Sequence, residues 1–233
     1  MKTLGLIGGT TWVSTVDYYR LINQQVNKKL GGLSSAKMLL YSVNFAEFNP
    51  PTDPNEWGEL TGKFTAISKN LEKAGADCIV FCANTPHIIA DDVQKIINIP
   101  IINIAEETAK AVAAQNYKKV GLLGTRITME QPFYKDKLLK YGISAIIPEF
   151  EDRKFIHASI LDEMAKEIFK EETKQRYLTI IKKLISDGAE AIVLGCTEIP
   201  ILIKQEDVPI PLFDTTLIHA SAIVDFAIGN HNA

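Results

Sequence analysis

The 233-residue chain has only three cysteines, and it lacks a CxxC pair or a Cys/His cluster at metal-ligand spacing. Small secreted domains that depend on disulfides carry more cysteines at regular spacings, and zinc sites need Cys or His ligands close together. Both a disulfide framework and a metal site are therefore disfavoured. We predict reduced thiols, as in proteins of the cytoplasm.

Long basic or apolar runs are also missing. The net charge is −3, from 25 basic and 28 acidic residues, so the phosphate-binding footprint of a nucleic-acid-binding protein is absent. No window approaches the roughly 20 apolar residues of a membrane span, and the first residues do not resemble a signal peptide. We expect a cytoplasmic protein whose partner is a small molecule, with no nucleic-acid or membrane partner.

Short β-branched runs alternate with helical periodicity, which is the pattern of βα units around a parallel sheet. Apolar residues recur at spacings of three and four in residues 57–74 and 177–185, so each segment predicts a helix with one buried face. A last, largely apolar helix is predicted over residues 215–226. The predicted strands are residues 4–7, 38–43, 78–81, 101–102, 120–123, 145–147, 191–194 and 211–213.

The chain contains an internal repeat, which emerges when its second half is laid on its first. Residues 4–8 (LGLIG) match 120–124 (VGLLG), residues 75–82 match 188–196 with one insertion, and residues 99–101 match 208–210. The offsets are 116, 113 to 114, and 109, so the same elements occur twice in the same order. We predict two similar α/β halves, with Cys82 and Cys196 at equivalent places.

Cys82 and Cys196 each follow a predicted strand, where parallel sheets bind ligands. Thr85 is the predicted N-cap and Pro86 the first residue of a helix after Cys82, and such a terminus favours anions and lowers a thiol pKa. Two thiols on opposite faces of a carbon suit a two-base isomerisation, since a proton leaves one face and returns to the other. Cys78, in mid-strand, is interpreted as a small buried hydrophobe, which is the alternative for the other two.

Six short motifs extend over nearly the whole chain. They are Gly8-Gly9 with Trp12 and Ser14-Thr15, Leu30-Gly31-Gly32, Cys82-Ala83-Asn84-Thr85 with His87, residues 124–129 (GTRITM), residues 195–199 (GCTEI), and Phe213-Asp214-Thr215 with His219. In this order they resemble the aspartate/glutamate racemase family, specifically its aspartate racemase branch, which includes broad-specificity amino-acid racemases.

The resemblance implies racemisation of acidic amino acids without a cofactor or metal, with Cys82 and Cys196 as the two catalytic bases. It implies an α/β fold of two pseudo-symmetric halves, each a short parallel sheet flanked by helices, with the active site in the cleft between them. We expect one domain of residues 1–100 plus 213–233 and another of residues 101–212. The family commonly forms homodimers, so a homodimer is expected.

Substrate-binding residues are carried over from the same resemblance. Segments around the two cysteines match those that hold the α-carboxylate and amino group, and the loop after the first strand is another wall of the site. Lys166 resembles a position that pairs with the side-chain carboxylate. The predicted substrate-binding residues are Thr10, Thr11, Thr52, Ala83, Asn84, Thr85, Thr125, Lys166, Thr197 and Glu198.

Some of these residues also have structural interpretations. Asp162 lies four residues before Lys166, which is the spacing of an exposed helical ion pair. Thr128 with Gln131 predicts a capping box at the start of the next helix, whereas Thr125 is better interpreted as a site residue.

The sequence departs from the family pattern at positions that bear on specificity. Thr10-Thr11 stand where Met-Ser is common, Pro86 stands where Met is common, and the loop around Thr52 offers no arginine for a second carboxylate. The pocket is therefore expected to accept glutamate or uncharged amino acids besides aspartate. The alternatives are a related isomerase or lyase, such as a maleate isomerase, and a non-catalytic carboxylate-binding protein. A thiol oxidoreductase is disfavoured, because no second thiol is closely spaced.

Overall fold

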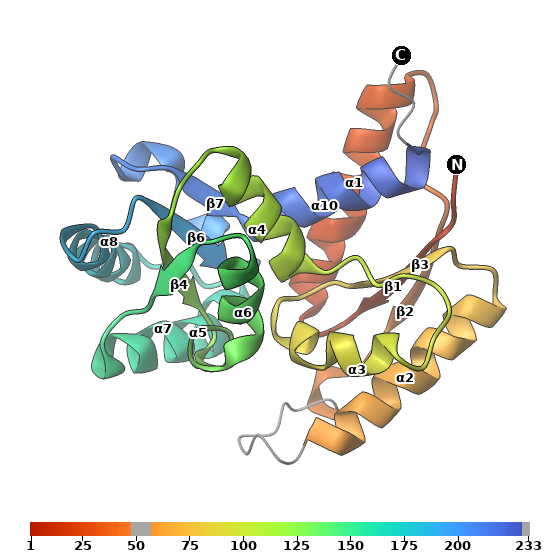
Figure 1. Cartoon of the computed structure of the whole chain (residues 1–233), viewed down its shortest axis with the longest axis horizontal. Coiled ribbons are helices and arrows are strands. Elements are labelled where there is room, and N and C mark those ends of the chain that lie inside the picture. The colour runs from red at the N-terminus through yellow and green to blue at the C-terminus, as the bar shows by residue number, and fades with distance from the viewer. Residues whose placement is uncertain (48–56, 230–233) are drawn as a thin grey trace. The chain divides into compact units, whose positions relative to one another are not determined.

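The computed structural model describes residues 1–47 and 57–229. The chain divides into two compact units, of which unit 1 comprises Met1–Asn103 with His219–Ala233 and unit 2 comprises Ile104–Ile218. Each unit is a parallel sheet flanked by helices, so the predicted fold class is confirmed (Figure 1). The finer prediction of domain boundaries near residues 100 and 213 stays a prediction.

Unit 1 is built on a three-stranded sheet in the order β2-β1-β3. The strands are β1 (Leu4–Gly8), β2 (Met38–Ser42) and β3 (Cys78–Phe81). The helices are α1 (Trp12–Leu30), α2 (Trp57–Lys73), α3 (Ala90–Gln94) and α10 (Thr215–Ile228), with short 3-10 helices η1 (Phe45–Glu47) and η3 (Thr85–Ile89).

Both faces of this sheet are covered by helices. Leu4 and Leu6 pack with the buried faces of α1 and α10, which lie on one side of the sheet, while α2 lies on the other (Figure 1). On the α2 side, the rings of Phe64 and Phe81 meet edge to face at 5.0 Å. Parallel strands that are buried on both faces are apolar throughout, which is why their sequences are apolar runs rather than alternating patterns.

Unit 2 is built on a four-stranded sheet in the order β5-β4-β6-β7. The strands are β4 (Lys119–Gly124), β5 (Ser144–Ile146), β6 (Ala191–Gly195) and β7 (Leu212–Asp214). The helices are α4 (Ile104–Ala114), α5 (Arg126–Glu130), α6 (Pro132–Lys140), α7 (Phe150–Asp162), α8 (Glu171–Ser186) and α9 (Ile199–Leu202), with 3-10 helices η4 (Met164–Lys166) and η5 (Gln205–Asp207).

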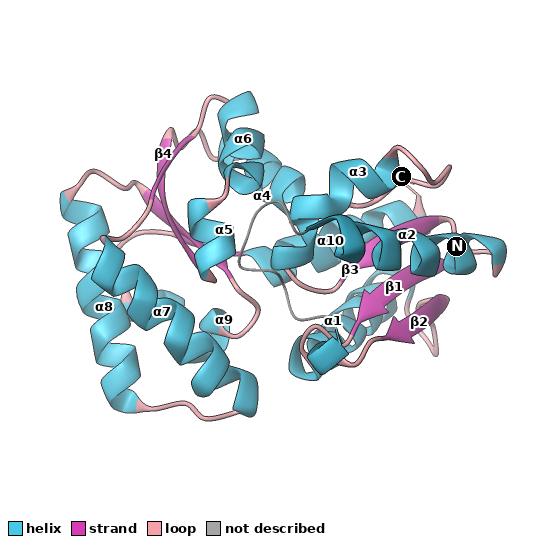
Figure 2. Cartoon of the chain, turned by 90° about the horizontal axis from the view of Figure 1, so that it is seen from below, coloured by secondary structure: helices cyan, strands magenta, loops and turns pink. Residues whose placement is uncertain are grey.

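Alternate residues of β6 fill two cores. Val193 packs on the side of α4 and α6, whereas Ile192 and Leu194 pack on the side of α7 and α8. Helices α7 and α8 lie alongside one another in Figure 2, and the ring of Tyr177 on α8 is fully buried in that second core. The helical stripe predicted over residues 177–185 is this buried face.

The internal repeat corresponds to the same strand pairing in both units. The central strand β1 pairs in parallel with β3, and β4 pairs in parallel with β6. The predicted strand over residues 101–102 is only an isolated bridge between Ile79 and Ile101, where the other half has the full strand β7. The ladder ends there because the next acceptor, the carbonyl oxygen of Ile102, lies 2.7 Å from Nε2 of His219 instead.

Both central strands end in glycine because a threonine of the following helix packs against them. A Cβ on Gly8 would lie 2.4 Å from Cγ2 of Thr15, and one on Gly124 would lie 2.7 Å from the carbonyl oxygen of Gly195 and 3.0 Å from Cγ2 of Thr128. Gly9 follows with a φ of 89°, in the region that favours glycine, and its N–H donates to Oγ1 of Thr15 at 2.8 Å. These contacts turn the chain sharply at the strand ends, where ligands of α/β proteins bind.

The turn between α5 and α6 differs from the prediction. Thr125 is the N-cap of α5 and its Oγ1 accepts the N–H of Thr128 at 3.3 Å, whereas Gln131 makes no side-chain cap of α6. The predicted capping box of Thr128 with Gln131 is therefore wrong. Gln131 is extended, with a ψ of 151°, because the residue before Pro132 is pushed out of the helical region.

No helix in the described part of the chain combines the length and the apolar character that crossing a membrane requires.

Candidate functional site

Cys82 lies at the carboxyl end of β3, and its side chain is fully buried. Its N–H donates to the carbonyl oxygen of Ile7 at 2.9 Å, so the parallel pairing with β1 extends as far as the cysteine. The N-cap of the following 3-10 helix is Asn84, without a side-chain cap, so the prediction that Thr85 is the N-cap is one residue off. Pro86, predicted as the first helical residue, is the second, because the helix begins at Thr85.

Ser14 connects the loop after β1 to Cys82. Its Oγ lies 2.9 Å from the carbonyl oxygen of Cys82 and 3.0 Å from that of Thr11, and the side chain is buried. Thr11 is the N-cap of α1, and its Oγ1 accepts the N–H of Ser14 at 3.2 Å. Sequence reasoning gave Ser14 no role. A small polar residue in the first turn after Gly8-Gly9 was the available signal.

Four other predicted residues of unit 1, Thr10, Ala83, Asn84 and Thr85, follow the carboxyl ends of β1 and β3. Oγ1 of Thr10 is buried and has no hydrogen-bond partner among the residues that the structure describes. Asn84 is 3 % exposed, and Ala83 and Thr85 are partly buried. The hydroxyl of Thr10 is thus held out of water and is available to a ligand. Thr52 lies outside the described residues.

A buried histidine pair packs close to this loop. His87 and His219 meet ring to ring at 5.4 Å, and burial lowers the pKa of His87 to about 4 and that of His219 to about 3. Nδ1 of His87 lies 2.9 Å from the carbonyl oxygen of Ala83, which follows Cys82 directly. Both imidazoles are neutral near pH 7, so neither supplies a positive charge that would stabilise a Cys82 thiolate.

Unit 2 has its own cluster at the carboxyl end of β6. Cys196, Thr197 and Glu198 are 8 %, 7 % and 2 % exposed. Sγ of Cys196 lies 2.9 Å and Oγ1 of Thr197 lies 2.7 Å from the same atom, Oε2 of Glu198. The structure therefore brings these three predicted residues together around one buried carboxylate.

Thr125 occupies the neighbouring strand end. Gly124 and Gly195 are paired in the β4–β6 ladder, so the residues that follow them, Thr125 and Cys196, leave the sheet side by side. Ile7 and Phe81 are paired in the same way in unit 1, ahead of Gly8 and Cys82. Each cysteine is thus the first residue after the strand that pairs with the central strand of its unit, and Cys196 lies one register position further along than Cys82.

The pKa of both candidate thiols differs from the sequence-based expectation. Burial raises the pKa of the Cys82 thiol, and burial together with the charge of Glu198 raises that of Cys196. The expectation that the helix N-terminus after Cys82 lowers the thiol pKa is wrong, because burial disfavours the charged thiolate. Both cysteines are protonated thiols near pH 7. Burial likewise raises the pKa of Cys78 to about 12.

Lys166 is not drawn into either cluster. Its side chain is 61 % exposed, and its Nζ lies 3.8 Å from Oδ1 of Asp162, four residues earlier. The pairing of Lys166 with a substrate carboxylate therefore stays a prediction. Among the described residues, no group of three or more His, Cys, Asp or Glu side chains could hold a metal ion.

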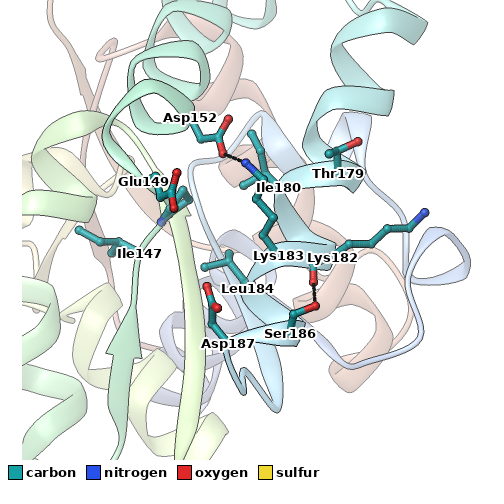
Figure 3. Close-up of a pocket in the computed structure, with 11 residues that line it drawn as sticks. Ile147, Glu149, Asp152, Thr179, Ile180, Lys182, Lys183, Leu184, Ser186 and Asp187 are labelled. Atoms are coloured by element: carbon teal, nitrogen blue, oxygen red, sulfur yellow. Dashed lines mark hydrogen bonds and ion pairs between the residues drawn. The ribbon is translucent and has the colours of Figure 1, made fainter.

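A surface pocket of about 380 Å³ lies elsewhere in unit 2, beside α7 and α8 (Figure 3). At its rim Nζ of Lys183 lies 2.9 Å from Oδ2 of Asp152. Among the described residues that line it, none belongs to the predicted site. The pocket is separate from the cysteine clusters, and it carries charges of both signs.

The chain is similar to racemases both in its match to a family model and in its sequence relatives. Residues 7–223 match the family model described as Asp/Glu/Hydantoin racemase. The broad specificity amino-acid racemase RacX of Bacillus subtilis (strain 168) is 26% identical over 224 residues, which cover 95% of this chain and 96% of RacX.

Solved structures are similar over nearly the whole chain. A Yersinia pestis protein provisionally described as an Asp/Glu racemase is 44% identical, with a TM-score of 0.91 and coverage of 98% of this chain and 100% of that one. An aspartate racemase homologue from Pyrococcus horikoshii OT3 is 36% identical, with a TM-score of 0.85 and the same coverage. The chain therefore belongs to the Asp/Glu/hydantoin racemase family. It is an amino-acid racemase, and racemases are isomerases.

Proposed function

We propose that this protein interconverts the L and D forms of acidic amino acids by a two-base mechanism in which Cys82 and Cys196 act on opposite faces of the α-carbon. The observation that carries the proposal is the matching placement of the two thiols, each directly after the last residue of its strand. Each follows the end of a strand that pairs with the central strand of its own unit, and each is buried. A structural cysteine has no need of such a counterpart in the other half.

The chemistry follows from what the α-carbon requires. One sulfur, as thiolate, takes the α-proton, and the electron pair left on carbon is delocalised into the substrate carboxylate. The other sulfur, as thiol, donates a proton to the opposite face, which inverts the configuration. The two thiols supply both the base and the acid, so the proposal requires no cofactor.

Buried polar groups in both units fit the binding of an amino acid. In unit 1, the hydroxyl of Thr10 and the side chains of Asn84 and Thr85 offer hydrogen bonds to a carboxylate. In unit 2, the buried carboxylate of Glu198 and the hydroxyl of Thr125 offer contacts to an ammonium group. Lys166 is our proposed partner for the side-chain carboxylate, and the relatives support aspartate as well as a broader range of substrates.

The proposal is tested with a panel of amino acids under reducing conditions, scored by chiral chromatography. We expect racemisation of aspartate, with glutamate and uncharged residues as the measure of breadth. Cys82→Ser and Cys196→Ser should each abolish turnover, because each removes one of the two bases. The control is Cys78→Ser, at the buried first residue of β3, which should lose stability but keep activity.

Exchange of the α-proton in deuterium oxide provides a second readout that does not depend on inversion. A protein that neither racemises nor exchanges any acidic amino acid would not be a racemase of this kind. Tight binding of a carboxylate ligand without exchange would favour the carboxylate-binding alternative. Formation of fumarate from maleate would favour the isomerase alternative.

Assembly and location belong to the same proposal. We propose a homodimer, on the family resemblance, and sedimentation in solution would measure it. The cytoplasmic location and the domain boundaries at residues 100 and 213 also stay predictions.

A further inference from the structure

Glu198 is a carboxylate buried against a reacting atom. It lies in the short segment between β6 and α9, and it is 2 % exposed. Its Oε2 faces two side chains that can donate, the thiol of Cys196 at 2.9 Å and the hydroxyl of Thr197 at 2.7 Å. The nearby phenol of Tyr177 on α8 has a different partner, Oγ of Ser159 at 3.1 Å.

The hydrogen bond between Cys196 and Glu198 requires one proton between the two groups. A thiolate beside a carboxylate would place two negative charges 2.9 Å apart in a buried site, which is strongly unfavourable. With one shared proton, the pair carries a single negative charge, on oxygen when the sulfur is protonated and on sulfur when the carboxyl is protonated. Proton transfer within the pair therefore produces a thiolate without changing the net charge of the site.

Cys82 has a different environment. Within the described part of the chain Cys82 is hydrogen-bonded through its backbone, with its N–H donating to the carbonyl oxygen of Ile7 and its own carbonyl oxygen close to Oγ of Ser14. Burial is the cause of its raised pKa, and the histidines of the same unit are neutral near pH 7. The two candidate bases thus both follow a strand end but differ in the proton acceptors beside their sulfurs.

We propose that Glu198 is the proton partner of Cys196 in catalysis, which rests on the two-base function proposed above. The Sγ–H proton of Cys196 passes to Oε2 of Glu198, and the thiolate so formed takes the α-proton of the substrate. Cys82 then gives its Sγ–H proton to the opposite face of the carbon. The site ends with Glu198 and Cys196 protonated and Cys82 as thiolate, so protons and charge balance.

Two protonation forms of the free enzyme follow from this sequence. One carries the negative charge on Glu198 and removes the proton on the Cys196 side, and the other carries it on Cys82 and removes the proton on the opposite side. Each form acts on one enantiomer. The forms interconvert by proton exchange with solvent or by turnover of the other enantiomer.

The test uses variants that retain one thiol each, Cys82→Ala and Cys196→Ala. In deuterium oxide, each should wash deuterium into the α-position of one enantiomer only, without inversion, as followed by loss of the α-proton signal in NMR. Glu198→Gln, which is isosteric, is then added to both. Glu198→Gln should slow the exchange rate of Cys82→Ala, in which Cys196 is the base, about 100-fold more than that of Cys196→Ala, in which Cys82 is the base. A factor of this size is usual for a general acid–base contribution.

Several outcomes separate this inference from its alternatives. Equal loss at both thiols, within about threefold, would mean that Glu198 binds substrate and is no proton partner, which would overturn the proposal. Glu206→Gln removes an exposed carboxylate from the same unit and should leave both exchange rates as they were. Absence of exchange and of racemisation in the unmodified protein would instead refute the proposed function.

Alkylation of the thiols by iodoacetamide, followed by mass spectrometry, is an independent measurement that needs no turnover. Replacing Glu198 by Gln removes the negative charge beside Sγ of Cys196, so its pKa falls and its alkylation at pH 8 should become about tenfold faster, with little change at Cys82. In the free enzyme the thiolate forms by proton loss to solvent, which the variant makes easier, whereas in the substrate complex the variant lacks the carboxylate that takes the Sγ–H proton. Alkylation should therefore rise while exchange falls. Unchanged or slower alkylation of Cys196 would contradict a shared proton between Cys196 and Glu198. If neither single-thiol variant exchanges deuterium, the alkylation rates alone test the proposal.

Discussion

The phenolic oxygen of Tyr18 lies 2.7 Å from Nδ1 of His219, and both side chains are fully buried. Nε2 of His219 lies 2.7 Å from the carbonyl oxygen of Ile102, which can only accept, so Nε2 carries the proton and Nδ1 accepts from the tyrosine. This chain of two hydrogen bonds joins α1, α10 and the segment after α3 within unit 1. It fixes the neutral tautomer of His219.

Tyr18→Phe should destabilise unit 1 by about 1–3 kcal/mol, because it leaves a buried imidazole nitrogen without its donor. Urea unfolding followed by circular dichroism measures the change. The matched control is Tyr19→Phe on the same helix, where the side chain is 56 % exposed and the change should be within about 0.5 kcal/mol. Equal effects at the two positions would contradict the role of the buried bond.

Stability should fall as the pH falls below about 6.5. His87 and His219 are held neutral with pKa values of about 4 and 3, whereas the unfolded chain takes up these protons near pH 6.5. Between these limits the unfolded state binds more protons, so each histidine lowers the free energy of unfolding by up to about 1.4 kcal/mol per pH unit. His219→Gln removes one titrating group and should make the measured slope shallower by that amount.

Gly9→Ala should abolish the native turn after β1. A Cβ at this position would lie 2.1 Å from the carbonyl oxygen of Val43, and the φ of 89° is itself unfavourable for alanine. Gly32→Ala is the control, with a φ of 59° and nothing within 4 Å of the added atom, so it should cost only about 1–2 kcal/mol. The difference in melting temperature between the two variants measures the clash with Val43, because both variants share the cost of a positive φ.

Lys166→Met should raise KM for aspartate and leave KM for alanine nearly unchanged, if the cation pairs with the substrate side chain. The exposed ion pair with Asp162 contributes no more than about 1 kcal/mol, so stability should hardly change. Lys154→Met, in a comparable exposed pair with Glu151, is the matched control. A KM for aspartate equal to that of the unmodified protein would remove Lys166 from the site.

The fold could be predicted from the sequence because the repeat and the apolar runs mark every strand. Residues 101–102 were the exception, since a carbonyl that binds His219 across 117 positions leaves no local signal. The strand-end positions of Cys82 and Cys196 were also predictable. Their raised pKa values were not, because burial and the charge of Glu198 depend on the packing of whole units rather than on neighbouring residues.

The discontinuity of unit 1 has a consequence for how the protein is made. Residues of α10 that belong to this unit, Ala220, Ile223, Val224 and Ala227, fill the same core as Leu4 and Cys82, and the N–H of Lys2 donates to the carbonyl oxygen of Ala227. A ribosome delivers unit 2 whole before it delivers these last residues. The strands of unit 1 are therefore synthesised before the helix residues that complete its core, and a chain that stops after residue 218 would lack one side of that core while unit 2 is complete.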